Sequence, residues 1–215
     1  MEEPKAYLKH RGKLAFLFNL LFKPTIIGNE KIPAEGRIVL AGNHTHFMDC
    51  ITVAASTERV VHFLAKSELT EPPLRRFFVP FGIIPVHRDR KDKAALDSAI
   101  EVLEDDKVIG IFPEGKVKLK TEAEFTITPF KFGAVKMARE TNTRIVPFAI
   151  TGKYKPFKRN IKITFFEPFE PEENLETANG KLMKIVSDKL HSRAVCHNFR
   201  SAVHHGRGGI AHSDD

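Results

Sequence analysis

The sequence predicts an α/β fold, in which helices cover a mixed, mostly parallel sheet. Short apolar runs alternate with segments of helical periodicity along most of the chain, as expected for strands that are followed by helices. The chain has 215 residues and is 42% hydrophobic, so it is long enough to bury a core of its own. No internal repeat or linker divides it, and the main domain is predicted over residues 25–190.

The first strand is predicted at 37–42, where the apolar run RIVLAG ends in glycine, and similar runs predict strands at 60–65, 82–88, 108–113, 144–150 and 161–166. The clearest helix is predicted over 91–106, where Ala95 and Val102 belong to an apolar face at roughly helical spacing. The other helices are predicted at 47–56, 71–78, 129–141 and within 173–191. Pro147 interrupts an apolar strand and therefore predicts a bulge or an edge strand there.

Residues 1–24 form a segment of basic and apolar composition. Its apolar run, Leu14–Phe22, is shorter than the roughly 20 residues that a membrane-spanning helix needs. Acidic residues near its start and the lack of a small-residue cleavage site argue against a signal peptide. Five cations flank the run: Lys5, Lys9, Arg11, Lys13 and Lys23. These features predict a helix that docks in the membrane interface. A buried core helix with a solvated basic end is the alternative.

The charge balance is basic, with 34 Lys and Arg residues against 27 Asp and Glu and a pI near 9.4. This excess predicts an anionic partner, and nucleic acid, anionic lipid and phosphorylated small molecules all qualify at this point. Cys50 and Cys196 form no disulfide framework, which indicates a reducing compartment. Residues 191–215 hold five of the ten histidines with several Gly and Ser residues, and they predict a disordered tail.

The stretch AGNHTHFMDC places His44, His46 and Asp49 directly after the first predicted strand. On a continuous helix, five positions turn about 500°, so His44 and Asp49 would lie on different faces. They can meet only if His44 lies in the loop and Asp49 in the first turns of the next helix. A carboxylate bound to one imidazole nitrogen fixes the tautomer and makes the other nitrogen a better base. The alternative is that Asn43 or Thr45 caps the helix.

A metal site is a further possibility for this stretch. His44, His46 and Asp49 are similar to the HxHxDH pattern of zinc-dependent hydrolases, but Asp49 is one residue too far from His46. Cys50, which adjoins an apolar helix, is interpreted as a small buried filler rather than a nucleophile.

Two later clusters suit an anionic ligand. Arg88 ends the strand at 82–88, where a guanidinium can bind phosphate in bidentate fashion. The stretch FPEGK places Glu114 and Gly115 in a sharp turn, followed by Lys116. Because sites in open α/β sheets form beyond the carboxyl ends of strands, we expect these clusters and His44 to share one edge of the sheet.

Taken in order, these clusters resemble the glycerolipid acyltransferase family, and most closely its bacterial-type 1-acyl-glycerol-3-phosphate (lysophosphatidate) acyltransferases. The sequence NHTHFMD is similar to the family's NH-x4-D block, GIIPVHR to its second block, FPEG to its third and VPFAI to its fourth. AKSEL, at 65–69, resembles the lysine-containing stretch between the first two blocks. The likeness covers about residues 25 to 165.

The resemblance implies that His44 is the general base, that Asp49 orients it, and that the acceptor hydroxyl attacks the thioester of acyl-CoA or acyl carrier protein directly. It also implies an acceptor site that binds glycerol phosphate, formed by Lys66, Arg88, Glu114, Gly115 and Lys116. No metal or prosthetic group is expected. Backbone N–H groups near the helix start after His44 are a candidate oxyanion site. The family usually continues FPEG with T-R-S, and here Val117 takes the place of the arginine.

The function expected from this resemblance is the transfer of a fatty acyl chain to lysophosphatidate, giving phosphatidate. The enzyme would lie on the cytoplasmic face of the membrane as a peripheral or monotopic protein, with lysophosphatidate, the acyl donor and the membrane surface as partners and no nucleic acid. Two alternatives stay open. One is a metal-dependent hydrolase that uses His44, His46 and Asp49, and the other is a non-catalytic protein that binds anionic lipid.

Overall fold

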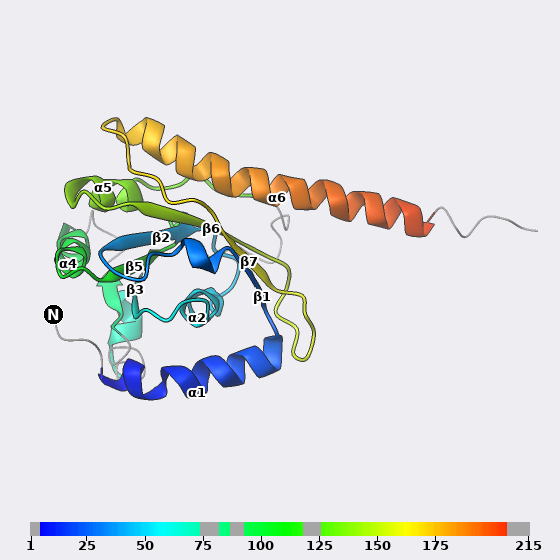
Figure 1. Cartoon of the computed structure of the whole chain (residues 1–215), viewed down its shortest axis with the longest axis horizontal. Coiled ribbons are helices and arrows are strands. Elements are labelled where there is room, and N and C mark those ends of the chain that lie inside the picture. Colours follow the sequence, from blue (N-terminus) through cyan, green and yellow to red (C-terminus); the bar gives the residue numbers. More distant parts are fainter. Residues whose placement is uncertain (1–4, 74–81, 87–92, 118–125, 206–215) are drawn as a thin grey trace, which may run out of the picture.

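The structure is a computed structural model that describes residues 5–73, 82–86, 93–117 and 126–205 (Figure 1). Among these residues it forms a seven-stranded sheet with the order β1-β7-β6-β2-β5-β3-β4. The strands are β1 (Thr25–Ile27), β2 (Ile38–Gly42), β3 (Val61–Lys66), β4 (Ile84–Val86), β5 (Val108–Ile111), β6 (Ile145–Thr151) and β7 (Lys162–Phe165). All neighbouring strands are parallel except β6 and β7. The predicted α/β class, with a mixed, mostly parallel sheet, is confirmed.

Pro147 lies in the interior of the sheet, because β6 pairs with β2 on one side and with β7 on the other. The predicted bulge is present opposite it. Phe148 pairs with Phe165 and Ile145 with Phe169, so the partner strand advances one residue further than β6 across this interval. The Pro147 carbonyl accepts a hydrogen bond from the N–H of Phe166 at 2.9 Å. The edge-strand alternative is therefore wrong.

Helices cover both faces of the sheet (Figure 1). One face carries α4 (Lys93–Glu104), α5 (Gly133–Glu140) and α6 (Leu175–His205), and the other carries α2 (Asp49–Ala55) with α1 (Lys5–Phe22) beyond it. Each face has its own apolar cluster of buried side chains. Among the described residues, the remaining helical elements are two short 3₁₀ turns, η1 (Asn29–Lys31) and η2 (Ser67–Thr70). The helix predicted at 71–78 falls largely outside the described residues.

The N-terminal segment is helical, as predicted, and it has two different apolar sides. Phe18 is 3% exposed and packs toward α2, near Phe22 and Tyr154. Phe16 and Leu20 lie on the other side of the helix, about 160° around its axis from Phe18, and are exposed to solvent, as are Leu14 and Leu17. The helix is therefore anchored to the domain by one side while it presents a second apolar side outward.

The prediction of disorder from His191 onward is corrected by α6, which continues through His205. Residues 191–205 contain neither glycine nor proline, the two residues that most strongly disfavour a helix interior, and the first glycine is Gly206. Residues 206–215 lie outside the described part of the chain.

Candidate active site

The candidate site lies at the carboxyl ends of β2, β5 and β6, which are adjacent in the sheet. β2 ends at Gly42, where a Cβ atom would lie 2.2 Å from the carbonyl oxygen of Phe148, so no larger residue fits without a backbone shift. The next residue, Asn43, is buried and exchanges two hydrogen bonds with the backbone of Ile150, at 2.9 and 2.8 Å. Its side-chain amide thereby connects the start of the loop after β2 to β6.

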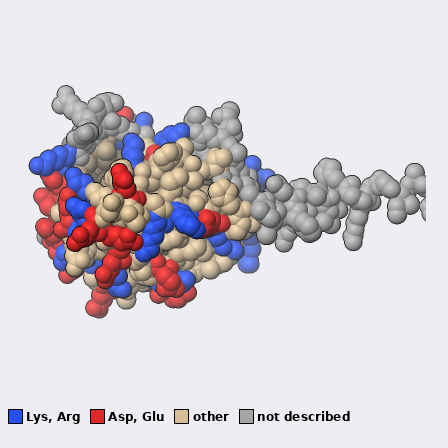
Figure 2. All heavy atoms as spheres, turned by 90° about the horizontal axis from the view of Figure 1, so that it is seen from above, with Lys and Arg blue, Asp and Glu red and all other residues tan. Residues whose placement is uncertain are grey.

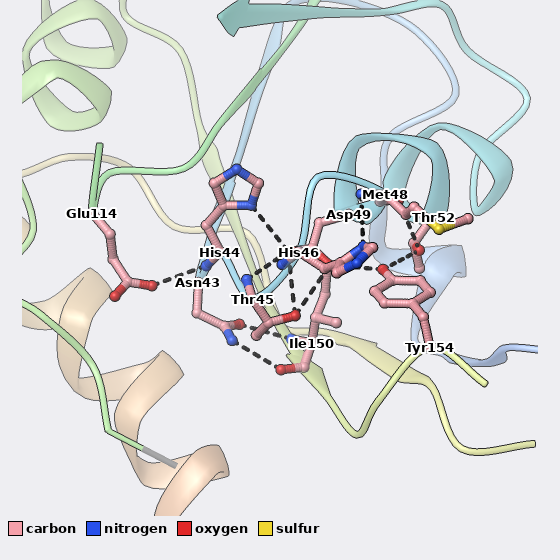
Figure 3. A network of polar contacts seen from close by, with 10 residues as sticks. All are labelled: Asn43, His44, Thr45, His46, Met48, Asp49, Thr52, Glu114, Ile150 and Tyr154. Atoms are coloured by element: carbon pink, nitrogen blue, oxygen red, sulfur yellow. Dashed lines mark hydrogen bonds and ion pairs between the residues drawn. The ribbon is translucent and has the colours of Figure 1, made fainter. Parts of the chain in front are cut away.

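The predicted contact between His44 and Asp49 is present (Figure 3). His44 lies in the loop after β2, Asp49 is the first residue of α2, and His44 Nδ1 is 3.0 Å from Asp49 Oδ2. Neither Asn43 nor Thr45 caps the helix, since the N-cap residue is Met48 and it makes no side-chain capping bond. The capping alternative is therefore wrong for both residues, and the loop-to-helix geometry brings the imidazole and the carboxylate together.

Asp49 is completely buried, and five groups of the chain point at its carboxylate. Oδ2 accepts hydrogen bonds from the backbone N–H groups of Thr45 at 2.6 Å and His46 at 2.8 Å, in addition to its contact with His44. Oδ1 accepts from the hydroxyls of Tyr154 at 2.7 Å and Thr45 at 3.2 Å. Together these five contacts fix the orientation of the carboxylate.

This arrangement engages several of the backbone donors that were expected to form an oxyanion site. The N–H groups of Thr45 and His46 bind Asp49, and the N–H of His44 binds the Glu114 carboxylate at 2.9 Å. The N–H of Met48 donates to the ring of His46 at 3.3 Å. These backbone donors near the start of α2 are therefore engaged within the chain.

The plane of the His44 ring is set by Phe112, the residue after β5. The two rings are stacked with their centroids 4.0 Å apart and an angle of 14° between their planes. The His44 side chain keeps 13% of its surface exposed. In Figure 3 its second ring nitrogen points away from Asp49, so one nitrogen is held by the carboxylate and the other faces elsewhere.

Glu114 holds the loop from the opposite side. It is 8% exposed, Oε1 accepts from the N–H of His44, and Oε2 accepts from both the N–H and the hydroxyl of Thr128, at 3.0 and 2.9 Å. The sequence predicted Glu114 as part of the acceptor site and did not single out Thr128. The structure shows that this carboxylate connects the His44 backbone to the segment before α5.

Tyr154 is the residue that sequence reasoning missed. It lies in the loop after β6, its hydroxyl donates to Asp49, and Thr52 of α2 lies 2.7 Å from the same hydroxyl. Burial, followed by the negative charge of Asp49, raises the pKa of Tyr154 well above its ordinary value, so the hydroxyl stays protonated and able to donate. The available signal was its place just beyond the carboxyl end of a predicted strand.

His46 takes part in this network through its backbone N–H, which donates to Asp49. The ring of His46 lies against Phe47 and Tyr154, with centroids 4.4 and 4.8 Å away. Burial, together with the charge of Asp49, raises the pKa of the Cys50 thiol to about 12, so it is protonated at neutral pH. Within residues 5–73, 82–86, 93–117 and 126–205, no group of three or more His, Cys, Asp or Glu side chains is placed to hold a metal ion.

The residues predicted to bind the acceptor lie partly along the same edge. Lys66 ends β3 and Lys116 follows β5, both are exposed, and these two strands are neighbours in the sheet. Gly115 has a φ of 68°, a left-handed conformation that suits glycine and forms the predicted sharp turn. Arg88 lies outside the described residues.

A histidine held by a buried carboxylate lies at the carboxyl edge of a mixed sheet, an arrangement that can activate a hydroxyl group by general-base catalysis. The Acyltransferase family model matches residues 23–151, which is more than half of the chain, and the chain belongs to this family. The family predicted from the sequence is thereby confirmed.

The chain is similar to two bacterial proteins that carry the name 1-acyl-sn-glycerol-3-phosphate acyltransferase. It is 25% identical to that of Bacillus subtilis over 174 residues, which cover 78% of this chain and 84% of the relative. It is 32% identical to that of Borreliella burgdorferi over 142 residues, which cover 65% of this chain and 55% of the relative. The chain therefore spans only about half the length of the second relative.

Among solved structures, the fold is similar to the 1-acyl-sn-glycerophosphate (LPA) acyltransferase PlsC of Thermotoga maritima. The TM-score is 0.70, the sequence identity is 22%, and the match covers 89% of this chain and 81% of that one. This likeness shows a shared fold.

Proposed function

We propose that the chain transfers a fatty acyl group from a thioester donor to the free hydroxyl of lysophosphatidate, giving phosphatidate. Membership in the Acyltransferase family and the names of the two bacterial relatives support this proposal. The observation that carries it is the 3.0 Å contact between His44 Nδ1 and the fully buried Asp49 carboxylate. The donor is acyl-CoA or acyl carrier protein, and the reaction uses no metal or prosthetic group.

In this mechanism, Asp49 keeps the proton of His44 on Nδ1, and Nε2 accepts the proton of the acceptor hydroxyl. The hydroxyl oxygen forms a bond to the thioester carbonyl carbon, and the carbonyl oxygen gains negative charge. When this intermediate collapses, the carbon–sulfur bond breaks and the leaving thiolate takes the proton from His44. A general base of this kind contributes about 10²–10⁴-fold to the rate.

The acceptor phosphate binds Lys66 and Lys116, the exposed cations along this edge of the sheet, together with Arg88. The turn at Gly115 lets the backbone approach the ligand closely. Glu114 supports this site by holding the backbone of His44, because both of its carboxylate oxygens accept hydrogen bonds from the chain. Val117 stands where the family usually has arginine, so lysine supplies the positive charge. A lysine ammonium binds phosphate as a point charge, whereas an arginine guanidinium can bind it in bidentate fashion.

We place the enzyme at the cytoplasmic face of the membrane, as a peripheral or monotopic protein. The exposed apolar side of α1, with Lys9 and Lys13 exposed on the same helix, suits the interface between head groups and acyl chains. Across the described residues, the structure has no helix that is long and apolar enough to cross a membrane. Lysophosphatidate is an acyl-bearing lipid that partitions into the bilayer, so docking there brings the acceptor to the site.

The test is a matrix of donors and acceptors, with purified protein in detergent and lipid products identified by mass spectrometry. We expect phosphatidate from lysophosphatidate with at least one thioester donor, and the same yield after treatment with a chelator. If no lysophospholipid or glycerol phosphate accepts an acyl group from any donor, the proposed function fails.

The same experiment separates the two alternatives. Hydrolysis that is lost with a chelator and restored by zinc would identify a metal-dependent hydrolase. Vesicle binding without any product would identify a non-catalytic lipid-binding protein.

A further inference from the structure

The loop between β6 and β7, residues 152–160, lies against the carboxyl end of α1 (Figure 1). The N–H of Phe157 in this loop donates to the carbonyl of Leu21 in α1. The ring of Tyr154, also in the loop, meets the ring of Phe22 edge-on with centroids 5.7 Å apart. Membrane docking is predicted from the sequence for residues 1–24 alone, yet the structure joins this loop to the end of that segment.

The loop has the composition of a membrane-facing surface. Phe157 at its tip is 69% exposed, which is unusual for a large aromatic side chain that has no polar group. Four exposed cations surround it in the sequence: Lys153, Lys155, Lys158 and Arg159. Neither the loop nor residues 5–27 contain an acidic residue. Positive charge around an exposed apolar anchor favours an anionic lipid surface.

A groove of about 460 Å³ runs between the two elements. Its lining residues come from the end of α1, from β1 and from the loop: Asn19, Leu20, Lys23, Pro24, Thr25, Ile26 and Arg159. Lys23 and Arg159 therefore line the same hollow, although they are far apart in the sequence. Leu20 is 52% exposed and belongs to the outward apolar side of α1, so this side of the helix continues into the groove.

The groove favours an anion despite its place at a helix end. The carboxyl end of α1 carries a partial negative charge of about one half from the helix dipole, which opposes an anion. Two side chains with full positive charge, Lys23 and Arg159, outweigh it, and a guanidinium suits the oxygens of a phosphate group. The opposite face of the molecule, on the side of α5 and α6, instead mixes acidic and basic side chains (Figure 2).

We infer that the β6–β7 loop is a second membrane-docking element, and that the groove between it and α1 binds the phosphate of an anionic phospholipid head group. Leu20 and Phe157 enter the bilayer on either side of that head group, while Lys23 and Arg159 bind its phosphate. The occupant is a bilayer rather than a free phosphate because exposed apolar side chains adjoin the cations. The inference rests on the proposed membrane location, and vesicle binding tests it without acyl transfer.

The experiment is co-sedimentation of the full chain with vesicles of phosphatidylcholine, and with vesicles of equal parts phosphatidylcholine and phosphatidylglycerol. The double variant Lys23→Gln/Arg159→Gln is expected to bind the anionic vesicles about 25-fold more weakly, since each cation near such a surface is worth about a factor of five. Its binding to pure phosphatidylcholine should change little. Phe157→Ala should lower binding to both vesicle types about tenfold, because the loss of an apolar anchor does not depend on lipid charge.

The matched control is Lys136→Gln/Lys184→Gln, which removes the same charge from α5 and α6 on the opposite face. It should bind both vesicle types like the wild type.

An equal loss of vesicle binding in the control and in the Lys23/Arg159 variant would refute the proposed phosphate site in the groove, since overall charge would then explain the binding. Unchanged vesicle binding in the Lys23/Arg159 variant would also overturn it. If that variant lost only transfer from acyl carrier protein, the loop would be a surface for the donor protein. Lack of acyl transfer by the wild type, with these vesicle results intact, would refute the proposed function alone.

Discussion

Two buried carboxylates hold His44 from opposite sides, and they differ in which part of the residue they contact. Asp49, on the α2 side, contacts the imidazole ring at 3.0 Å. Glu114, on the β5 side, accepts the main-chain N–H of the same residue at 2.9 Å. A carboxylate on the ring can change the tautomer and basicity of the imidazole, whereas one on the backbone can only fix the position of the loop. We therefore expect Asp49, whose oxygen contacts the ring, to affect the chemistry, and Glu114, whose oxygen contacts the backbone, to support the loop.

The largest effect is expected at the residue that the two carboxylates share. His44→Ala should lower kcat for acyl transfer by about 10³-fold, because it removes the general base. The bond from residue 44 to Glu114 comes from the backbone, so the loop should persist. Initial rates with a thioester donor and lysophosphatidate measure the effect, and vesicle binding serves as the control. A variant that kept full transfer activity would rule out His44 as the base.

The second prediction tests the Asp49 side. Asp49→Asn keeps the size of the side chain but replaces one acceptor oxygen by a donor, and it should lower kcat by about 10²-fold with little change in KM. The unfolding midpoint should also fall, because donors such as the Thr45 N–H lose their partner. A kcat within threefold of the wild type would show that Asp49 only stabilises the loop.

Glu114→Gln tests the other side. An amide can still accept from one of the two groups, the N–H of His44 or Thr128, so a loss in kcat of about tenfold is expected, with KM for lysophosphatidate nearly unchanged. Thr128→Val, which removes one donor to the same carboxylate, is the matched control and should have a smaller effect. A large rise in KM for lysophosphatidate would contradict this supporting role, since it would show that Glu114 binds the substrate as the sequence predicted.

The smallest effect is expected for Tyr154→Phe, which removes one of the five groups at the Asp49 carboxylate and keeps the ring against α1. One hydrogen bond is worth about 1 kcal/mol, so kcat should fall about fivefold at constant KM. Tyr154→Ala also removes the packing with Phe22 and should lower the unfolding midpoint. If the phenylalanine variant had a normal kcat, Asp49 would be adequately held by Thr45 and His46 alone.

The local part of this site could be predicted from the sequence, and the distant part could not. Helical geometry alone required His44 in the loop and Asp49 near the helix start, and the structure has that arrangement. The roles of Glu114 and Tyr154 depend on contacts that span 70 and 105 residues. Such contacts follow from the order of strands β6, β2 and β5, which apolar periodicity does not specify.

The sequence by itself determined the alternation of strands and helices, the family and the spacing of His44 and Asp49, because each of these is a local pattern. The tertiary structure decided the rest. It turned Glu114 toward the His44 backbone, brought Tyr154 to Asp49, and placed Arg159 beside Lys23 in one groove. Each of these contacts joins segments that are far apart along the chain, and only the packing of the sheet and its helices brings them within reach of one another.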